Sequence, residues 1–283
     1  MKKRRIQEIV DYYDYCECDF RYNWHLDDCK AMHIGFWDNQ TANLRQALIR
    51  QNEIMALKAK ITLKDQILDA GCGIGGSAFF LAKNFGCKVT GITLSKKQAE
   101  SANNSSKLEN TDRLTQFYVM DFNQTAFKEQ SFDVVWVLES YCYADDKEAF
   151  VKEVNRILKK NGRLILADTF ETRRKYKLIE KKMIDGWIKR WAVNSLITKQ
   201  EFRNHLKNNG FGNIEYFDIS KNVEPSSRKL FFRSLLALPA AKIAYWQGYR
   251  NRIQNENILG AINQYLTVRL ELCEYGMYYA EKS

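Results

Sequence analysis

The stretch Gln66–Gly76, QILDAGCGIGG, decides how the fold of this chain is interpreted. A short apolar run ends in an acid, a glycine-rich turn follows, and the apolar segment Ser77–Phe85 comes next. Glycine has no Cβ, so such a turn lets the backbone approach a ligand at the start of a helix. The spacing of Gly71, Gly73 and Gly76 also fits the dinucleotide fingerprint, so the glycines alone do not identify the ligand.

Strand-like and helix-like segments alternate after this turn. The expected strands are Gln66–Ala70, Lys88–Thr93, Thr115–Met120, Phe132–Leu138 and Arg163–Asp168, and the expected helices are Ser77–Phe85, Lys96–Lys107 and Asp145–Leu158, the last closed by Asn161-Gly162. The run Phe132–Leu138 is continuously apolar, as in a parallel strand that is covered on both faces. This alternation predicts an α/β fold with right-handed crossovers and a doubly wound, mostly parallel sheet.

The pattern changes on both sides of this core. The expected elements beyond it are helices in Thr41–Lys60, Glu171–Leu196, Thr198–Asn209 and most of Val223–Leu272, and strands in Asn213–Ser220 and Glu274–Glu281. We expect an aromatic, helical N-terminal cap (residues 1–60), a core (61–220), a helical lid insertion (221–273) and a final core strand (274–283). A lid at this place in the chain would cover the carboxyl ends of the strands, where such folds bind ligands.

The chain of 283 residues carries a formal net charge of +10, which permits binding to nucleic acid or to an anionic membrane. Basic residues gather in Lys2–Arg5, Arg173–Lys177, Lys181–Arg190 and Arg228–Arg233. Solvated helix faces are the more ordinary interpretation, and peripheral contact with anionic lipid is the alternative. No separate nucleic-acid recognition domain or base-flipping motif is evident, so we do not expect nucleic acid as a partner.

The basic N-terminus has no apolar segment of a signal peptide behind it, and no stretch is apolar for the length of a transmembrane helix. We therefore expect a cytoplasmic protein. Seven scattered cysteines without a CxxC pair suggest reduced thiols. The spacing of Cys16, Cys18 and Cys29 matches no common zinc site, so we expect no metal.

Candidate ligand-binding residues follow four successive strands. They are Asp69 with the glycine turn, Thr93-Leu94-Ser95 with Gln98, Asp121-Phe122, and the segment Glu139–Tyr143. The carboxyl ends of parallel strands lie at one edge of a sheet, so these groups should face one crevice.

These motifs closely resemble those of the class I S-adenosylmethionine-dependent methyltransferases. The resemblance rests on LDAGCGIGG, VTGITLSKKQ, MDF, FDVVWVLES and LKKNGRLILAD, and it extends to MHIGFWD and CEYGMYYAEK. Within that family the chain looks most like the subgroup of sterol C-methyltransferases, tocopherol methyltransferases and cyclopropane fatty acid synthases. The resemblance covers Met32–Asp168 well and the remainder weakly. It implies a seven-stranded Rossmann-like sheet and S-adenosylmethionine as the cofactor.

The resemblance also implies how the cofactor is held. The methionine part would contact Asp69, Gly71 and Gly73, the ribose and adenine would contact Thr93, Leu94, Gln98, Asp121 and Phe122, and Glu139 would lie beside the sulfonium. A dinucleotide is the weaker alternative, because the residues ITLS that end the second strand contain no acid for a ribose diol. An acid directly before the glycine turn also suits an ammonium group better than a pyrophosphate.

The acceptor side of the site is less specific in the sequence. The candidates for orienting the acceptor and relaying a proton are His33, Glu139 and Tyr143. The candidates for the substrate pocket are Trp37, Tyr141, Cys142, Trp187, Trp191 and Trp246. Relatives in the subgroup often carry a histidine at the place of Tyr143, so an acid–base role there is in doubt. Aromatic residues at helical spacing more often pack in a core, although in a lid they can form an apolar pocket.

The sequence therefore predicts a methyltransferase that acts on a small, largely apolar acceptor, such as a sterol, a quinol or phenol, or another natural product. Because the methyl group of a sulfonium is already activated, the protein must mainly bind, align and exclude water. An acceptor atom that bears a proton additionally needs a base. The alternatives are N-methylation of a small polar amine and, from another class, a module that modifies or binds nucleic acid.

Overall fold

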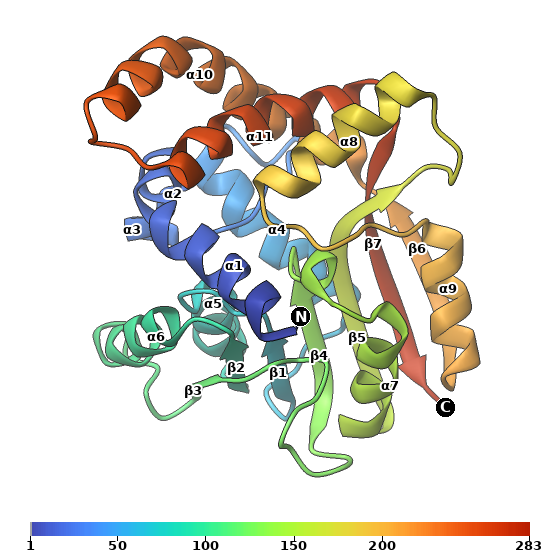
Figure 1. Cartoon of the computed structure of the whole chain (residues 1–283). Coiled ribbons are helices and arrows are strands. Elements are labelled where there is room, and N and C mark those ends of the chain that lie inside the picture. Colours follow the sequence, from blue (N-terminus) through green and yellow to red (C-terminus); the bar gives the residue numbers. More distant parts are fainter. Residues whose placement is uncertain (1) are drawn as a thin grey trace.

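The computed structural model describes residues 2–283, with side chains from Arg5 onward (Figure 1). The strands are β1 (Gln66–Ala70), β2 (Lys88–Thr93), β3 (Thr115–Val119), β4 (Phe132–Leu138), β5 (Leu158–Glu171), β6 (Phe211–Asp218) and β7 (Cys273–Lys282). The helices are α1 (Lys2–Tyr15), α2 (Glu17–Trp24), α3 (Leu26–Cys29), α4 (Leu44–Lys58), α5 (Gly76–Phe85), α6 (Lys96–Leu108), α7 (Lys147–Ile157), α8 (Leu178–Arg190), α9 (Lys199–Asn208), α10 (Ser220–Trp246) and α11 (Arg252–Arg269). Of the predicted basic segment Lys2–Arg5, only the Arg5 side chain falls within the described residues.

Within residues 2–283, seven strands form one sheet in the order β3-β2-β1-β4-β5-β7-β6. The strands from β3 to β5 are parallel to their neighbours, and β7 runs antiparallel between β5 and β6. The order reverses between β1 and β4, and ligands of such sheets bind at the carboxyl ends of the strands beside that point. The doubly wound, mostly parallel sheet predicted from the sequence is confirmed.

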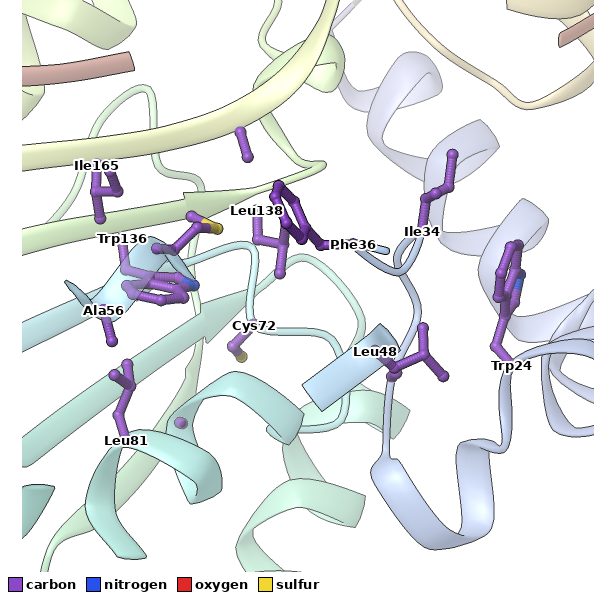
Figure 2. Packing of buried hydrophobic residues seen from close by; sticks show 14 of the residues in the cluster. Trp24, Ile34, Phe36, Leu48, Ala56, Cys72, Leu81, Trp136, Leu138 and Ile165 are labelled. Atoms are coloured by element: carbon purple, nitrogen blue, oxygen red, sulfur yellow. The ribbon is translucent and has the colours of Figure 1, made fainter. Parts of the chain in front are cut away.

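Successive residues of β4 point to opposite faces of the sheet, as the pleat requires. Val134 and Trp136 belong to the core cluster beneath α4, α5 and α6, whereas Val135 and Val137 belong to the cluster beneath α7 and α9. Figure 2 shows Trp136 beside Ala56 of α4, Leu81 of α5 and Ile165 of β5. Burial on both faces explains why this strand is apolar at successive positions.

The largest differences from the predicted element boundaries are at β5 and α8, and Asn161-Gly162 lies within β5 rather than closing α7. Strand β5 starts at Leu158 rather than at Arg163 and continues to Glu171, which pairs with Cys273 of β7. The predicted helix Glu171–Leu196 is therefore wrong at its start, and α8 begins only at Leu178. Antiparallel pairing with β7 runs to Glu171 and accounts for the C-terminal extension of β5. A local sequence pattern does not show pairing between segments that are distant in the chain.

Helices cover the carboxyl ends of the strands. In Figure 1, α8, α10 and α11 form a layer over that edge of the sheet, and the N-terminal helices α1 and α2 lie beside this layer. Helices α10 and α11 occupy the chain between β6 and β7. In the described part of the chain, no helix has the length and apolar character needed to cross a membrane.

Candidate active site

A cavity lies where the glycine turn meets the ends of β2, β3 and β4, with α1 on its open side. We call it the glycine-turn cavity. It is lined by backbone and side chains of the predicted cofactor motifs, among them Asp69, Gly71, Gly73, Thr93, Leu94 and Gln98. The structure therefore brings together residues from separate strand ends that the sequence analysis assigned to one ligand.

Gly71, Gly73 and Gly75 of the turn adopt conformations that other residues rarely adopt. Gly71 has φ 97° and Gly73 has φ 53°, both in the left-handed region. A Cβ on Gly71 would lie 2.3 Å from the Cβ of Ser140, so the turn could not pass β4 with any larger residue. At Gly73 a Cβ would lie 3.1 Å from the sulfur of Met32, which also lines the cavity. Because Gly71 and Gly73 have no side chains, a ligand can approach the backbone of the turn.

Asp69 is the last acid before the turn, and it is only 3% exposed. Its Oδ2 has no hydrogen-bond partner among the described residues. Burial raises the pKa of this carboxyl from 3.8 to about 7. A buried carboxylate without a partner is costly, so a cationic or hydrogen-bond-donating ligand group would stabilise its charged form. The ammonium group of S-adenosylmethionine is such a group.

The end of β2 forms a local hydrogen-bonded cluster. Thr93 donates its hydroxyl proton to Oε1 of Gln98 at 2.6 Å, and Gln98 Nε2 contacts the sulfur of Met32 at 3.8 Å. Ser95 accepts from the backbone N–H of Gln98 as the helix cap, and its own hydroxyl donates to Asp14 of α1 at 2.9 Å. The second strand end is thereby tied to the N-terminal helix that closes the cavity.

Of the two residues predicted to contact the cofactor after β3, only one lines the glycine-turn cavity. Phe122 lines the glycine-turn cavity and contacts Phe150 edge-on, with the ring centroids 5.3 Å apart. The Asp121 side chain does not reach the lining of this cavity, and its Oδ1 accepts from the backbone N–H of Asn123 at 2.9 Å. The structure thus pairs Asp121 Oδ1 with Asn123, and the adenine contact of Asp121 stays a prediction.

A second cavity of about 510 Å³ adjoins the first. It lies between α1 and α2 on one side and α8, α10 and α11 on the other, and we call it the apolar cavity. Much of its wall is apolar or aromatic, including Tyr12, Trp24, Trp187, Leu230 and Ala241. Its size and lining are those of a pocket for a small organic molecule.

Five residues line both cavities, and they mark the place where the cavities meet. They are Tyr13, Met32, His33, Glu139 and Tyr143. The three predicted catalytic residues thus lie at the junction. A ligand in one cavity would meet a ligand in the other beside these side chains.

Glu139 is held firmly at this junction. Its Oε1 accepts from the backbone N–H of Ile34 at 2.7 Å and from the hydroxyl of Tyr275 at 2.6 Å. Burial raises its pKa from 4.5 to about 7, while the bond from Tyr275 lowers it. Its backbone has φ 52°, a strained conformation that is often found at functional sites. A carboxyl with this pKa can accept a proton near neutral pH.

His33 has a different environment. Its Nδ1 lies 3.0 Å from the carbonyl oxygen of Ile34, which can only accept, so Nδ1 carries the proton. Its Nε2 then accepts from Nδ2 of Asn52 at 3.4 Å. Burial lowers the pKa of His33 to about 4. The ring is therefore neutral at pH 7 and both of its nitrogens have partners, which suits positioning better than proton transfer.

Residues 141–143 form a short helical turn after β4, and their side chains point in different directions. Tyr143 lines both cavities and donates its hydroxyl proton to the carbonyl of Trp191 at 3.2 Å, and burial raises its pKa well above the usual value. Cys142 lines the apolar cavity. Tyr141 lies outside both cavities, because its ring packs between Phe150 and Phe202.

The predicted tryptophans divide into two groups. Trp187 and Trp191 line the apolar cavity and contact each other edge-on at 6.0 Å. Trp37 lies outside both cavities, because its Nε1 donates to Ser226 at 2.8 Å and thereby joins the MHIGFWD segment to α10. Trp246 is 79% exposed at the end of α10 and points away from the cavity.

Several lining residues could not be selected from the sequence. Asp168 lines the apolar cavity, and its Oδ2 accepts from the backbone N–H of Cys142 at 2.9 Å. Tyr13 and Met32 line both cavities and come from the N-terminal region. Tyr275 of β7 lines neither cavity but donates its hydroxyl proton to Glu139. The sequence predicts a strand for the segment LILAD and includes it among the motifs of the resemblance, but it assigns no site role to Asp168.

Comparison with known proteins finds that this chain is similar to methyltransferases. A family model described as a methyltransferase domain matches residues 68–166. The chain is 30% identical to 27-O-demethylrifamycin SV methyltransferase of Amycolatopsis mediterranei, over 70% of this chain and 72% of that protein. It is 28% identical to a glycine/sarcosine/dimethylglycine N-methyltransferase of Actinopolyspora halophila, over 78% and 38%. It is 30% identical to the chloroplastic tocopherol O-methyltransferase of Arabidopsis thaliana, over 69% and 61%.

The match spans about two fifths of the length of the Actinopolyspora halophila protein and about three fifths of the length of the Arabidopsis thaliana protein. Among solved structures, a putative sarcosine dimethylglycine methyltransferase from Galdieria sulphuraria is similar, with a TM-score of 0.80 and 19% identity. That similarity covers 96% of this chain and 99% of that chain, so the cap and the helical layer share its fold as well as the sheet.

Proposed function

The chain belongs to the class I S-adenosylmethionine-dependent methyltransferases, and we propose that it methylates a small, largely apolar acceptor bound in the apolar cavity. S-adenosylmethionine is the cofactor of this family, and it supplies a methyl group activated by its sulfonium. The observation that carries the proposal is the junction of the two cavities, because a cofactor and an acceptor would meet there beside Glu139, His33 and Tyr143.

We assign the residues of the chain to three tasks. Gly71, Gly73 and Asp69 hold the methionine part of the cofactor, the last through its unpartnered carboxylate oxygen. Thr93, Leu94, Gln98 and Phe122 line the part of the glycine-turn cavity beyond β2 and β3, where the ribose and adenine would lie. Trp187 and Trp191 form part of the wall that holds the acceptor and excludes water.

Of the three catalytic candidates, Glu139 is the one we propose as the proton acceptor. Its pKa of about 7 leaves it substantially ionised near neutral pH. The pKa of His33 is about 4, and the pKa of Tyr143 is raised well above the usual value, so neither is suited to take a proton at pH 7. We propose that these two orient the acceptor.

A mass-spectrometric screen tests the proposal. The purified protein is incubated with S-adenosylmethionine and with sterol, quinol, phenol, fatty-acyl and amine acceptors, and each product is examined for one added methyl group. Gly73→Arg serves as the control, because its side chain would extend into the cofactor cavity. A product that forms with an apolar acceptor and disappears in the control supports the proposal, whereas transfer only to small amines contradicts it.

N-methylation of a small amine is the second candidate, and one observation favours it. Asp168 and Glu139 both line the apolar cavity, and acids can hold an ammonium group. Aromatic rings such as those of Trp187 and Trp191 can also attract a cation. Replacement of Asp168 by Asn separates the two candidates, because it should weaken binding of an amine much more than binding of a neutral acceptor.

Two predictions from the sequence extend the proposal. We propose that the enzyme acts in the cytoplasm, and that its basic surface makes peripheral contact with an anionic membrane. The net charge of +10 supports that contact. The acceptor is a small molecule under either candidate function.

A further inference from the structure

Helix α10 has two faces with different surroundings. Its inner face, represented by Leu230, Ser234, Ala237 and Ala241, lines the apolar cavity. Its N-terminal part is anchored to the core, since Ser226 accepts from the indole N–H of Trp37 at 2.8 Å. Figure 1 shows α10 at the upper edge of the molecule, with α11 between much of α10 and the sheet. At this place α10 alone therefore separates the apolar cavity from solvent.

The outer face of α10 is apolar and exposed. Phe232, Leu236, Ile243 and Trp246 recur at helical spacing, and they are 56%, 83%, 51% and 79% exposed. We call these four residues the outer stripe. A single exposed apolar residue is ordinary, but a contiguous stripe of large ones usually marks an interaction surface.

The charge around the outer stripe has one sign. Between Glu224 and Glu256 the sequence contains no Asp or Glu and six basic residues. Lys242 precedes Ile243 of the stripe, and Arg228 lies one turn before Phe232. Arg228 has an acid, Glu224, at 3.7 Å, where α10 begins. An apolar stripe that carries a tryptophan and is flanked by cations is the pattern of a helix that lies in the surface of an anionic bilayer.

We propose that the outer stripe of α10 docks on an anionic lipid bilayer. The apolar side chains would enter the boundary between headgroups and acyl chains, and Arg228 and Lys242 would face the anionic headgroups. Trp246 has Tyr245 and Tyr249 as neighbours in the sequence, and the aromatic side chains of Trp and Tyr favour the headgroup level of a bilayer.

A second copy of the chain fits this surface less well. In a symmetric dimer the same patch faces itself, so Lys242 beside the stripe would face basic residues of the second copy, and no acid lies between positions 224 and 256 to neutralise it. An anionic bilayer offers both an apolar interior and the opposite charge. Charge complementarity therefore favours lipid.

Docking would place the acceptor cavity against the bilayer, because the inner face of the docked helix lines that cavity. This part of the inference rests on the proposed function: an apolar acceptor that dissolves in lipid would be taken up beside α10 rather than from water. The docking itself rests only on the outer stripe and its charges.

Vesicle co-sedimentation tests the docking. The full chain is mixed with vesicles of phosphatidylcholine alone and with vesicles that also contain phosphatidylglycerol, at low and at high salt. We expect binding to the anionic vesicles at low salt and its loss at high salt or without phosphatidylglycerol. Arg228→Gln with Lys242→Gln should weaken binding by about fivefold for each cation removed. Leu236→Ser with Trp246→Ser should weaken it by about tenfold or more.

Matched controls come from surfaces remote from α10. Leu108 on α6 is 83% exposed and Leu63 is 70% exposed, so Leu108→Ser with Leu63→Ser removes exposed apolar surface elsewhere. Lys96→Gln with Lys152→Gln removes two exposed cations from α6 and α7. Both control pairs should bind vesicles as the unchanged protein does.

Three results would overturn the inference. They are no binding to anionic vesicles, equal loss in the control pairs, and a vesicle-free oligomer that the outer-stripe variants dissociate, which would identify a second copy as the partner. Calorimetry with S-adenosylmethionine and transfer to a detergent-dispersed acceptor are measured on the same samples. Intact transfer without docking refutes this inference alone, whereas failure to bind the cofactor refutes the proposed function.

Discussion

Replacement of Asp69 by Asn should raise the stability of the cofactor-free protein while weakening cofactor binding. The carboxyl is 3% exposed, and burial raises its pKa from 3.8 to about 7. The folded chain therefore holds this proton more tightly than the unfolded chain. The free energy of unfolding that this proton contributes is fully present below pH 3.8 and is lost as the pH rises to about 7. At about 1.36 kcal/mol per pKa unit, the loss amounts to about 4 kcal/mol.

The amide that this substitution introduces does not titrate, so the variant avoids this loss. An unpaired amide in the same place costs about 1–3 kcal/mol, which leaves a net gain of about 1–3 kcal/mol at pH 8. At pH 5 most of the loss has not yet occurred in the unchanged protein, so the two proteins should differ little. The affinity for S-adenosylmethionine should fall by about tenfold to a hundredfold, because a charge-assisted hydrogen bond to its ammonium group is worth about 1.5–3 kcal/mol.

Urea unfolding without cofactor at pH 5 and pH 8 measures the stability, and titration calorimetry at pH 8 measures the affinity. The exposed Asp112→Asn is the matched control, and it should change neither quantity. Glu139 contributes a pH dependence of the same sign in both proteins, so the comparison is made between variant and parent at each pH. A stability difference that is the same at both pH values, or an unchanged affinity, would refute the role of Asp69.

Three further changes test other parts of the site. Glu139→Gln should lower kcat/KM for an acceptor that loses a proton and remove a rise in kcat/KM with pH centred near 7; a retained pH profile would assign the base elsewhere. Gly260→Ala would place a Cβ 2.4 Å from the Trp191 indole, so we expect about 1–3 kcal/mol of destabilisation and a raised acceptor KM, and an unchanged KM would argue against Trp191 as a pocket wall. Arg250→Leu breaks the two bonds, 2.9 and 2.8 Å long, that join the α10–α11 connection to Asp19 of α2, and proteolysis should then cut that connection faster than in the parent.

The residues predicted to hold the cofactor line the glycine-turn cavity, apart from Asp121, and their assignment to the cofactor stays a prediction. Glycines with positive φ, an acid before them and polar residues after successive strands are local features, and each is fixed by a few neighbouring residues. Thr93, Gln98 and Phe122 were placed at one cavity because parallel strands end at one edge of the sheet. The Asp121 side chain is turned toward Asn123, since a rotamer depends on contacts that the strand pattern does not specify.

The lining of the apolar cavity was decided by tertiary structure. Trp187 and Trp246 have similar helical contexts in the sequence, yet one is buried in the cavity wall and the other is exposed on α10. Helical periodicity shows that a helix has an apolar face, but it does not show which neighbour covers that face. The same limit applies to Tyr275 of β7, which reaches Glu139 only because β7 inserts antiparallel beside β5.

By itself, the sequence determined the sheet, the glycine turn and the family, because these follow from residues close together in the chain. The tertiary structure alone determined which side chains line the apolar cavity and in which direction their pKa values shift. Those properties depend on burial between α1, α8, α10 and α11, which lie at opposite ends of the chain and whose packing no local pattern encodes.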